Sequence, residues 1–431
     1  MRREKRPYRK ACLIAIAAIW LNASVWAAEG KAQTAKYVDY VAELNKLGMA
    51  GRSENLNAAP FYQKAIELYV EGSQEQKDLA RKGWPADFPA REQQLLREWV
   101  QSSSQALSQL ELGSKKPYCW FQLSSPDGTI MTVLTPDLAD YKNLGRAITV
   151  RARFSAAEGN IDKALTDVVT CYRCGMHRQM GGPKILVEQL VGIAVRALAV
   201  QTAFDILDRT KVNKDLLAAL QRQMEGLSTD ESYIPDFRSE KFSLLDIIQR
   251  IFTDDGKGDG QIDLPSAKRI LGEAGLPEGM RRRQMIETTE KVYRYLDGVV
   301  QKTPWQWKAE KMDLEQGIAQ ITGENGLVRL FSPATTRTVE VFTRCRVDTD
   351  GLVTTLAVLR YKADKGQFPE KLDELISAGY FKALRSDPFS SRPFVYKRVG
   401  EDFVLYSFGR NLKDGVCFTF VGIKVALHIG K

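Results

Sequence analysis

The sequence predicts a mainly α-helical protein of stacked helical hairpins, tetratricopeptide-like in part, that ends in a small α+β module. Over most of the 431 residues, apolar side chains recur at spacings of three and four, which is the period of an amphipathic helix. Glycines follow several of these segments, where helices commonly stop. Residues 335–431 instead contain runs that alternate apolar and polar side chains, which is the period of a strand.

Residues 1–27 form a predicted secretory signal peptide. Six basic residues within the first ten precede the apolar run ACLIAIAAIWL, and the small residues Val25 and Ala27 follow. An uncleaved N-terminal anchor is the alternative, because residues 11–28 approach the length that spans a bilayer, although Asn22 and Ser24 interrupt the run. We therefore expect a periplasmic or extracellular protein with no stable membrane span after cleavage.

The charge of the chain argues against a nucleic-acid partner. The formal net charge is +9, and loss of residues 1–27 removes six basic residues and Glu4, which leaves +4. Nucleic-acid binding is typical of dense stripes of Lys and Arg. The nearest candidate, MRRRQ at residues 280–284, is short and lies within a predicted helix.

Residues 28–115 form the predicted N-terminal helical region. Its segments YVDYVAELNKLG, APFYQKAIELYVEG and REQQLLREWVQSSSQALSQLEL place apolar residues at helical spacing. Gly48 and Gly72 stand where two of these helices are expected to stop.

Residues 116–330 form the predicted helical-hairpin domain. Its first segment, KPYCWFQLSSPDGTIMTVLTP, is predicted to be a short hairpin or an ordered loop. In AAEGNIDKAL, the small residues Ala156, Gly159 and Ala164 surround a tight turn between helices, and the segment resembles one tetratricopeptide hairpin. Residues 181–207 are apolar around most of the helix circumference and predict a central buried helix. Further helices are expected at residues 213–226, 234–252, 279–302 and 305–320.

Residues 335–431 form the predicted α+β module. Leu352, Leu356 and Leu359 mark one face of a long helix, which we expect to end before Pro369 because a residue that precedes proline avoids the α region. RPFVYKRVGEDFVLYSFG alternates like two antiparallel strands joined at residues 400–402, and VCFTFVGIKVALHI adds a further strand.

A set of residues spread over about 60 positions of this module matches a known family. The set comprises Tyr361, Asp364, Gly366, Phe368, Pro369, Leu372, Leu375, Asp387, Pro388, Phe389, Tyr396, Tyr406, Ser407, Gly409, Asp414 and Gly415. In these residues the module resembles the globular domain of the major pseudopilin of type II secretion, protein G. The whole chain resembles secreted bacterial proteins that carry a similar tail after a helical region, a resemblance that implies no activity.

Two departures limit what the resemblance implies. Pseudopilins assemble through an N-terminal hydrophobic helix that follows a Phe-Thr-Leu-x-Glu run, which neither residues 1–30 nor the stretch before Leu352 contains. The family also binds calcium in the loop after its Tyr-Ser strand. The corresponding loop here, GRNLKDGV, has one acid, Asp414, beside Lys413, which argues against calcium there.

The segment TDDGKGDGQID, residues 253–263, is a second candidate for calcium. With Asp255 as the first position of an EF-hand-like loop, Gly260 falls at the sharp turn, but Lys257 replaces one ligand and Ser266 replaces the final glutamate. A plain connecting loop is the favoured alternative, and no other cofactor is expected. The candidate calcium ligands are Asp255, Asp259, Gln261 and Asp263.

The cysteines are too few for a disulfide scaffold, and an odd number after cleavage leaves at least one thiol free while other pairings stay open. Cys171, Cys174 and His177 share a helix face and could hold a soft metal, but a zinc site needs a fourth ligand, and the other histidine is His428. Core thiols are the favoured alternative. The cysteines after residue 27 are Cys119, Cys171, Cys174, Cys345 and Cys417.

The sequence contains no recognisable catalytic motif. It lacks a Gly-x-Ser-x-Gly elbow, and its two histidines leave few bases for a nucleophile. Our first hypothesis is a secreted or periplasmic non-catalytic binding or scaffolding protein with a protein or peptide partner, because stacked hairpins offer concave surfaces. The alternatives are an envelope enzyme whose acids assemble only in the fold, and an accessory protein of a secretion system. A pocket with two acids of perturbed pKa would favour the enzyme.

Overall fold

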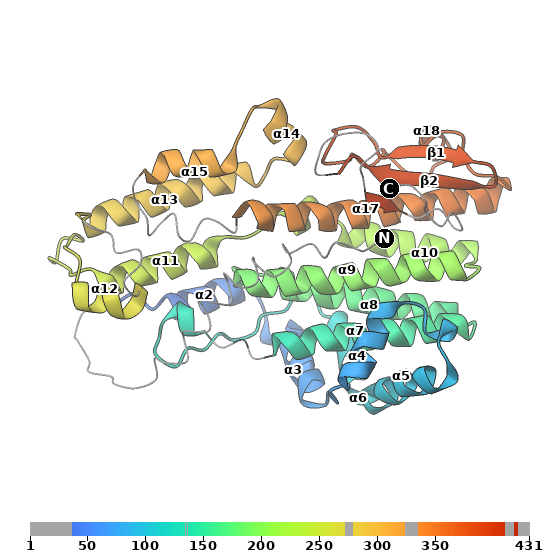
Figure 1. The fold of residues 1–431 in the computed structure, drawn as a ribbon, viewed down its shortest axis with the longest axis horizontal. Coiled ribbons are helices and arrows are strands. Elements are labelled where there is room, and N and C mark those ends of the chain that lie inside the picture. The colour runs from blue at the N-terminus through green and yellow to red at the C-terminus, as the bar shows by residue number, and fades with distance from the viewer. Residues whose placement is uncertain are drawn as a thin grey trace, which may run out of the picture.

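A computed structural model describes residues 37–133, 135, 137–271, 279–323, 335–409 and 418–420. The predicted signal peptide, residues 1–27, and the loop GRNLKDGV lie outside the described residues, except for its first residue, Gly409. The chain is mainly helical with a small antiparallel sheet near the C-terminus, which confirms the predicted fold class (Figure 1).

Five helices form the N-terminal part of the fold. A side-chain cap by Asp39 starts the first of them, and a capping box of Ser73 and Gln76 starts the third. Gly48 lies in the last turn of the first helix, where a Cβ would be 2.1 Å from the indole ring of Trp120, so the glycine allows a close approach. The helices are α2 (Tyr40–Met49), α3 (Ala59–Glu67), α4 (Gln74–Lys82), α5 (Ala90–Ser102) and α6 (Ser104–Ser114).

Over its described residues 116–133, the segment after α6 is an ordered loop and forms no hairpin of its own. The Asn57 side chain holds it, because its amide donates to the Trp120 carbonyl at 2.9 Å and its oxygen accepts from the Trp120 N–H at 2.9 Å. Asn45 makes the same pair of bonds to Leu123, at 2.9 and 2.8 Å. Side chains of the N-terminal region, one in α2 and one just before α3, therefore replace the cross-strand bonds that a hairpin would make.

Four long helices form the centre of the molecule: α7 (Leu138–Ala157), α8 (Ile161–Gln179), α9 (Leu186–Arg209) and α10 (Lys214–Leu227). Gly159, with φ of 84°, makes the predicted turn between α7 and α8. At the crossing of α8 and α9, a Cβ at Gly175 would lie 2.6 Å from the carbonyl of Gly192. Among the described residues, α9 is the one helix long and apolar enough to cross a membrane, and just over half of its apolar window is buried, as in a core helix.

A second group of helices extends from the middle of the molecule to one end of its long axis (Figure 1). It comprises the 3₁₀ turn η5 (Asp230–Tyr233), α11 (Arg238–Ile251), α12 (Leu264–Leu271), α13 (Arg282–Val299), α14 (Pro304–Ala309) and α15 (Leu314–Thr322). The prediction of one helix over residues 305–320 is wrong. Lys311 takes a φ of 54°, which ends α14, and Asp313 then caps α15.

The C-terminal module begins with the long helix α17 (Thr335–Lys365), followed by α18 (Asp373–Ser377) and the strands β1 (Val395–Val399), β2 (Asp402–Ser407) and β3 (Phe418–Phe420). The strands pair in the order β1-β2-β3, all antiparallel, and β1 and β2 meet at the predicted turn. The long helix ends before Pro369, as predicted, but not at the proline itself. Gly366, with φ of 77°, ends α17 first.

Two large hydrophobic cores hold the fold together. The first core takes buried residues from 58–119, 141–224 and 347–405, and the second core takes Leu186, Val339 and buried residues from 237–318. The predicted boundary between residues 115 and 116 therefore falls inside the first core. Both α9 and α17 run from one core to the other, and a small cluster that includes Tyr233 and Phe342 lies between the cores. We call this region the junction.

Candidate functional site

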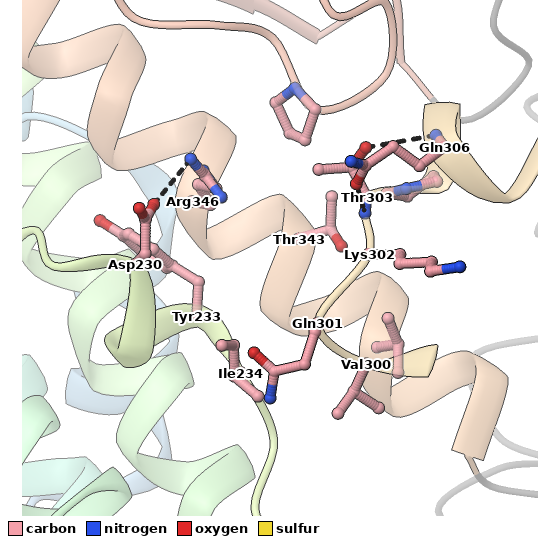
Figure 2. A pocket seen from close by; sticks show the side chains of 13 residues that line it. Asp230, Tyr233, Ile234, Val300, Gln301, Lys302, Thr303, Gln306, Thr343 and Arg346 are labelled. Atoms are coloured by element: carbon pink, nitrogen blue, oxygen red, sulfur yellow. Dashed lines mark hydrogen bonds and ion pairs between the residues drawn. The ribbon is translucent and has the colours of Figure 1, made fainter. Parts of the chain in front are cut away.

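A cavity of about 380 Å³ opens at the junction, and we call it the junction pocket (Figure 2). Three segments that are far apart in the sequence enclose it: the chain around η5, the connection from α13 to α14, and the first half of α17. A turn of the C-terminal module adds Pro388. The lining residues are Asp230, Tyr233, Ile234, Val300, Gln301, Lys302, Thr303, Pro304, Gln306, Val339, Thr343, Arg346 and Pro388.

Local hydrogen bonds fix the wall between α13 and α14. The Thr303 hydroxyl accepts from the Gln306 N–H at 3.3 Å, and the Thr303 N–H donates to the Gln306 side-chain oxygen at 2.7 Å, which is a capping box. The Trp305 N–H donates to the Pro388 carbonyl at 3.2 Å. The turn of the C-terminal module is thereby tied to the wall of the pocket.

Buried polar contacts hold the opposite wall of the pocket, which is formed by the chain around η5. The Tyr233 hydroxyl bonds to the Ser228 hydroxyl at 2.6 Å, and burial raises the pKa of Tyr233 well above its usual value. Arg196, which has no exposed surface, stacks on the Tyr233 ring, 4.9 Å from its centroid. Arg196 also donates to the Tyr172 hydroxyl at 2.6 Å and to the Ser232 carbonyl at 2.8 Å, so η5 is held firmly.

Arg346 is the principal charged group of the pocket. Its Nη2 lies 2.8 Å from an oxygen of Asp230, and its Nε lies 3.6 Å from an oxygen of Asp350 one helical turn away. The two acids differ in exposure, because the side chain of Asp230 is 82% exposed and that of Asp350 is 3% exposed. Arg385 adds a second cation at 3.5 Å from Asp350. Asp350 thus holds the guanidinium of Arg346 on its buried side. On its other side the guanidinium faces the cavity beside the exposed Asp230 (Figure 2).

Lys302 makes a different contribution. Its ammonium group pairs with Glu310, a residue outside the lining, and Figure 2 shows its side chain directed away from Arg346. The hydroxyl of Thr343 and the amide of Gln301 supply uncharged hydrogen-bonding groups between the two walls. The arrangement offers one fixed guanidinium, several uncharged polar groups, and the apolar surfaces of Ile234, Val300 and Val339.

The predicted calcium ligands lie in one loop, but the chain itself engages their oxygens. Asp259 accepts from the Arg283 N–H at 3.1 Å and from Arg281 Nε at 2.6 Å, and these bonds lower its pKa to about 2. One oxygen of Asp255 accepts from the Lys257 N–H and the Asp259 N–H, at 2.8 and 3.0 Å.

The other two predicted ligands take part in the backbone bonding of the loop. The Gln261 carbonyl accepts from the Thr253 N–H at 2.9 Å, and the Asp263 N–H donates to the Ile251 carbonyl at 2.8 Å. In the described part of the chain, no group of three or more His, Cys, Asp or Glu residues is arranged to hold a metal ion. The two interpretations of this loop, a weak calcium site and the favoured plain connection, both stay predictions.

The three side chains of the candidate soft-metal site contact different partners. They belong to Cys171, Cys174 and His177. The Cys171 thiol donates to the Gly145 and Val195 carbonyls at 3.7 and 3.6 Å, and burial raises the pKa of Cys174 to about 12. His177 Nδ1 bonds to the Tyr62 hydroxyl at 2.6 Å, and burial lowers the pKa of His177 to about 4. All four cysteines among the described residues are buried and free of disulfides, as expected of core thiols, and Cys417 lies outside that range.

Sequence reasoning did not identify the junction pocket. Its lining comes from residues 230–234, 300–306, 339–346 and Pro388, which no local pattern connects. One signal was present, because Arg346 and Asp350 stand four residues apart in a helix that is otherwise deeply buried. Comparison of the chain with protein-family models, with curated proteins and with solved structures found no match.

Proposed function

We propose that the protein is an exported, non-catalytic binding protein that holds a short stretch of a peptide or protein partner in the junction pocket. The observation that carries this proposal is the cavity itself, built from three distant segments. Its volume of about 380 Å³ is near the lower end of the range for ligand sites, about 300–1,000 Å³. A space of this size suits the end or one turn of a peptide and is too small for a folded domain.

The lining chemistry supports a peptide ligand. A peptide backbone carries one donor and one acceptor per residue, and each needs a partner once it leaves water. Thr303, Gln306, Gln301 and Thr343 can serve as donors and acceptors, while the apolar surfaces between them can receive a side chain. Such a mixture is typical of sites that bind and orient a ligand.

The same lining supports binding without catalysis. Acid–base chemistry commonly uses two groups of different pKa, and covalent catalysis uses a nucleophile next to a base. The residues that line the junction pocket include one acid, Asp230, and no His, Cys or Ser. Burial raises the pKa of Asp350, which lies against Arg346 but outside the lining. Two further acids with raised pKa lie away from the lining: Glu240, at about 7, accepts from the Leu186 N–H at the start of α9, and Asp348, at about 6, pairs with Arg344.

Export is supported by the predicted signal peptide at residues 1–27 and is compatible with the thiols. An oxidising compartment attacks exposed thiolates first. Burial raises the pKa of Cys119 to about 12 and also raises that of Cys345, which keeps these groups protonated and shielded. The protein can therefore keep free cysteines outside the cytoplasm.

The proposal is tested by equilibrium dialysis of residues 28–431 against a mixture of acetylated, amidated tripeptides whose middle residue is acidic, basic, polar or apolar. Mass spectrometry then identifies the tripeptides that the protein retains. We expect the wild-type chain to retain a subset, and Thr343→Phe, which places a ring in the cavity, to retain none. Thr336→Phe is the matched control, because Thr336 lies on the same helix outside the lining. Retention that is unchanged by Thr343→Phe would refute this site.

A further inference from the structure

We propose that the junction pocket selects a carboxylate, which Arg346 binds by exchanging Asp230 for the ligand. This inference rests on the proposed function and names the group that the site recognises. The carboxylate can belong to an acidic side chain, to the C-terminus of a peptide or to a small free acid, and all three present the same planar pair of oxygens.

The buried side of Arg346 is fixed, which leaves its outer side to a ligand. Asp350 is 3% exposed and lies 3.6 Å from Arg346 Nε and 3.5 Å from Arg385. The aromatic ring of Tyr233 supports the guanidinium at 5.9 Å. A guanidinium held in this way keeps its fork in one orientation, and the fork matches the two oxygens of a carboxylate.

On its outer side, Arg346 pairs with Asp230, and water competes with Arg346 for this acid. The side chain of Asp230 is 82% exposed, although it lies 2.8 Å from Arg346 Nη2. Exposed ion pairs are weak, because water and salt screen them. A ligand carboxylate inside the cavity would meet the same fork with less screening and would leave the buried pair with Asp350 intact.

The charge of the lining favours an anion over a cation. Arg346 is the cation available to a ligand, because Lys302 pairs with Glu310 and is directed away from Arg346, and Asp230 is the one acid among the lining residues. A cationic ligand would have only Asp230 to pair with, and Asp230 is already engaged by Arg346. An anionic ligand gains the guanidinium and can also accept from the hydroxyl of Thr343 and the amide of Gln301.

Isothermal titration calorimetry with matched probes tests the inference on residues 28–431. Acetyl-Ala-Glu-Ala-amide is compared with acetyl-Ala-Gln-Ala-amide, which has the same shape without the charge. Free tri-alanine is compared with its C-terminal amide, and succinate represents a small free acid. We expect each acid to bind about tenfold or more tightly than its amide partner, because a hydrogen bond to a charged group contributes more than one to a neutral group. The probe with the highest affinity identifies the source of the carboxylate.

Three substitutions separate the roles of the charges. Asp230→Asn removes the competing acid and should tighten acid binding about two- to fivefold, which corresponds to the strength of an exposed ion pair. Arg346→Gln should weaken it about tenfold or more. Arg344→Gln is the matched control, because Arg344 lies on the same helix outside the lining and is 60% exposed. It should leave the affinity unchanged.

The outcomes distinguish this inference from the proposed function. Equal affinity for acid and amide peptides would overturn carboxylate selection and leave peptide binding standing. Binding of succinate alone would support carboxylate selection and refute the peptide partner. Weaker acid binding by Asp230→Asn would overturn the exchange, and absence of binding by every probe would overturn both proposals. Because Arg346→Gln disturbs a buried ion pair, its thermal unfolding is measured as well, and Arg346→Lys provides a second variant that keeps the charge and loses the fork.

Discussion

The acidic loop at residues 253–263 and the junction pocket both place aspartates against arginines, but they differ in where the partners come from. In the loop, Asp259 is held by Arg281 and Arg283 at the start of the neighbouring helix, at the protein surface. Next to the pocket lining, Asp350 is buried on α17 and shared by Arg346 of the same helix and Arg385 of the C-terminal module. The loop therefore neutralises its charge locally, whereas the pocket depends on contacts made only in the complete fold.

The largest expected effect compares these two aspartates directly. Asp350→Ala removes a buried carboxylate that two partly exposed arginines share and should lower the free energy of unfolding by about 2 kcal/mol, because groups left without a hydrogen-bonding partner are costly. Asp259→Ala removes a carboxylate at the surface whose side chain is 15% exposed, and it should lower the free energy of unfolding by less than Asp350→Ala does. Urea unfolding of both variants, followed by circular dichroism, measures the difference. Equal losses would show that the two ion-pair clusters are energetically alike.

The same contrast explains how much of the structure the sequence could predict. The sequence predicted the turn at Gly159 between α7 and α8, because a tight turn between helices depends on neighbouring residues. The break between α14 and α15 at Lys311 was missed, since no glycine or proline marks it. The first half of α17 was also missed, because a helix that packs against both cores has no single apolar face for periodicity to reveal.

The candidate site was less predictable than the fold. The acidic loop was identified as a candidate because its acids lie close together in the sequence. The same proximity lets backbone N–H groups and nearby arginines donate hydrogen bonds to their carboxylates. Arg346 and Asp230 are 116 positions apart, and only the packing of η5 against α17 brings them together. A local pattern contains no information on such a pair.

A second prediction uses pH to separate the two environments. Burial raises the pKa of Asp348 on α17 to about 6, whereas hydrogen bonds lower that of Asp259 to about 2. A carboxyl whose pKa is raised in the folded state contributes to stability at pH values below its pKa in the unfolded chain, about 3.9. That contribution is lost as the pH rises through 6. A lowered pKa acts in the opposite sense, because its contribution is present above about 3.9 and is lost as pH falls toward 2.

Asp348→Asn should therefore raise stability at pH 7 by about 1 kcal/mol, since partial exposure reduces the effect of the shift. The substitution should also flatten the dependence of stability on pH between 4 and 6. Asp259→Asn should change the dependence of stability on pH only below about pH 4. Urea unfolding at a series of pH values provides the measurement. An unchanged slope between pH 4 and 6 in Asp348→Asn would assign that slope to another group, such as Glu240, whose pKa is also raised, to about 7.

The smallest expected effect concerns calcium. A cation at residues 253–263 would have to displace Arg281 from Asp259 and would lack the bidentate glutamate that strong sites use at the last position, where Ser266 stands. We expect the midpoint of thermal unfolding of residues 28–431 to be the same in millimolar calcium and in excess chelator. A rise of several degrees that Asp259→Ala abolishes would show that the loop exchanges its arginines for an ion. The loop would then resemble the proposed pocket, where a weakly held partner gives way to a ligand, and the contrast between the two regions would be lost.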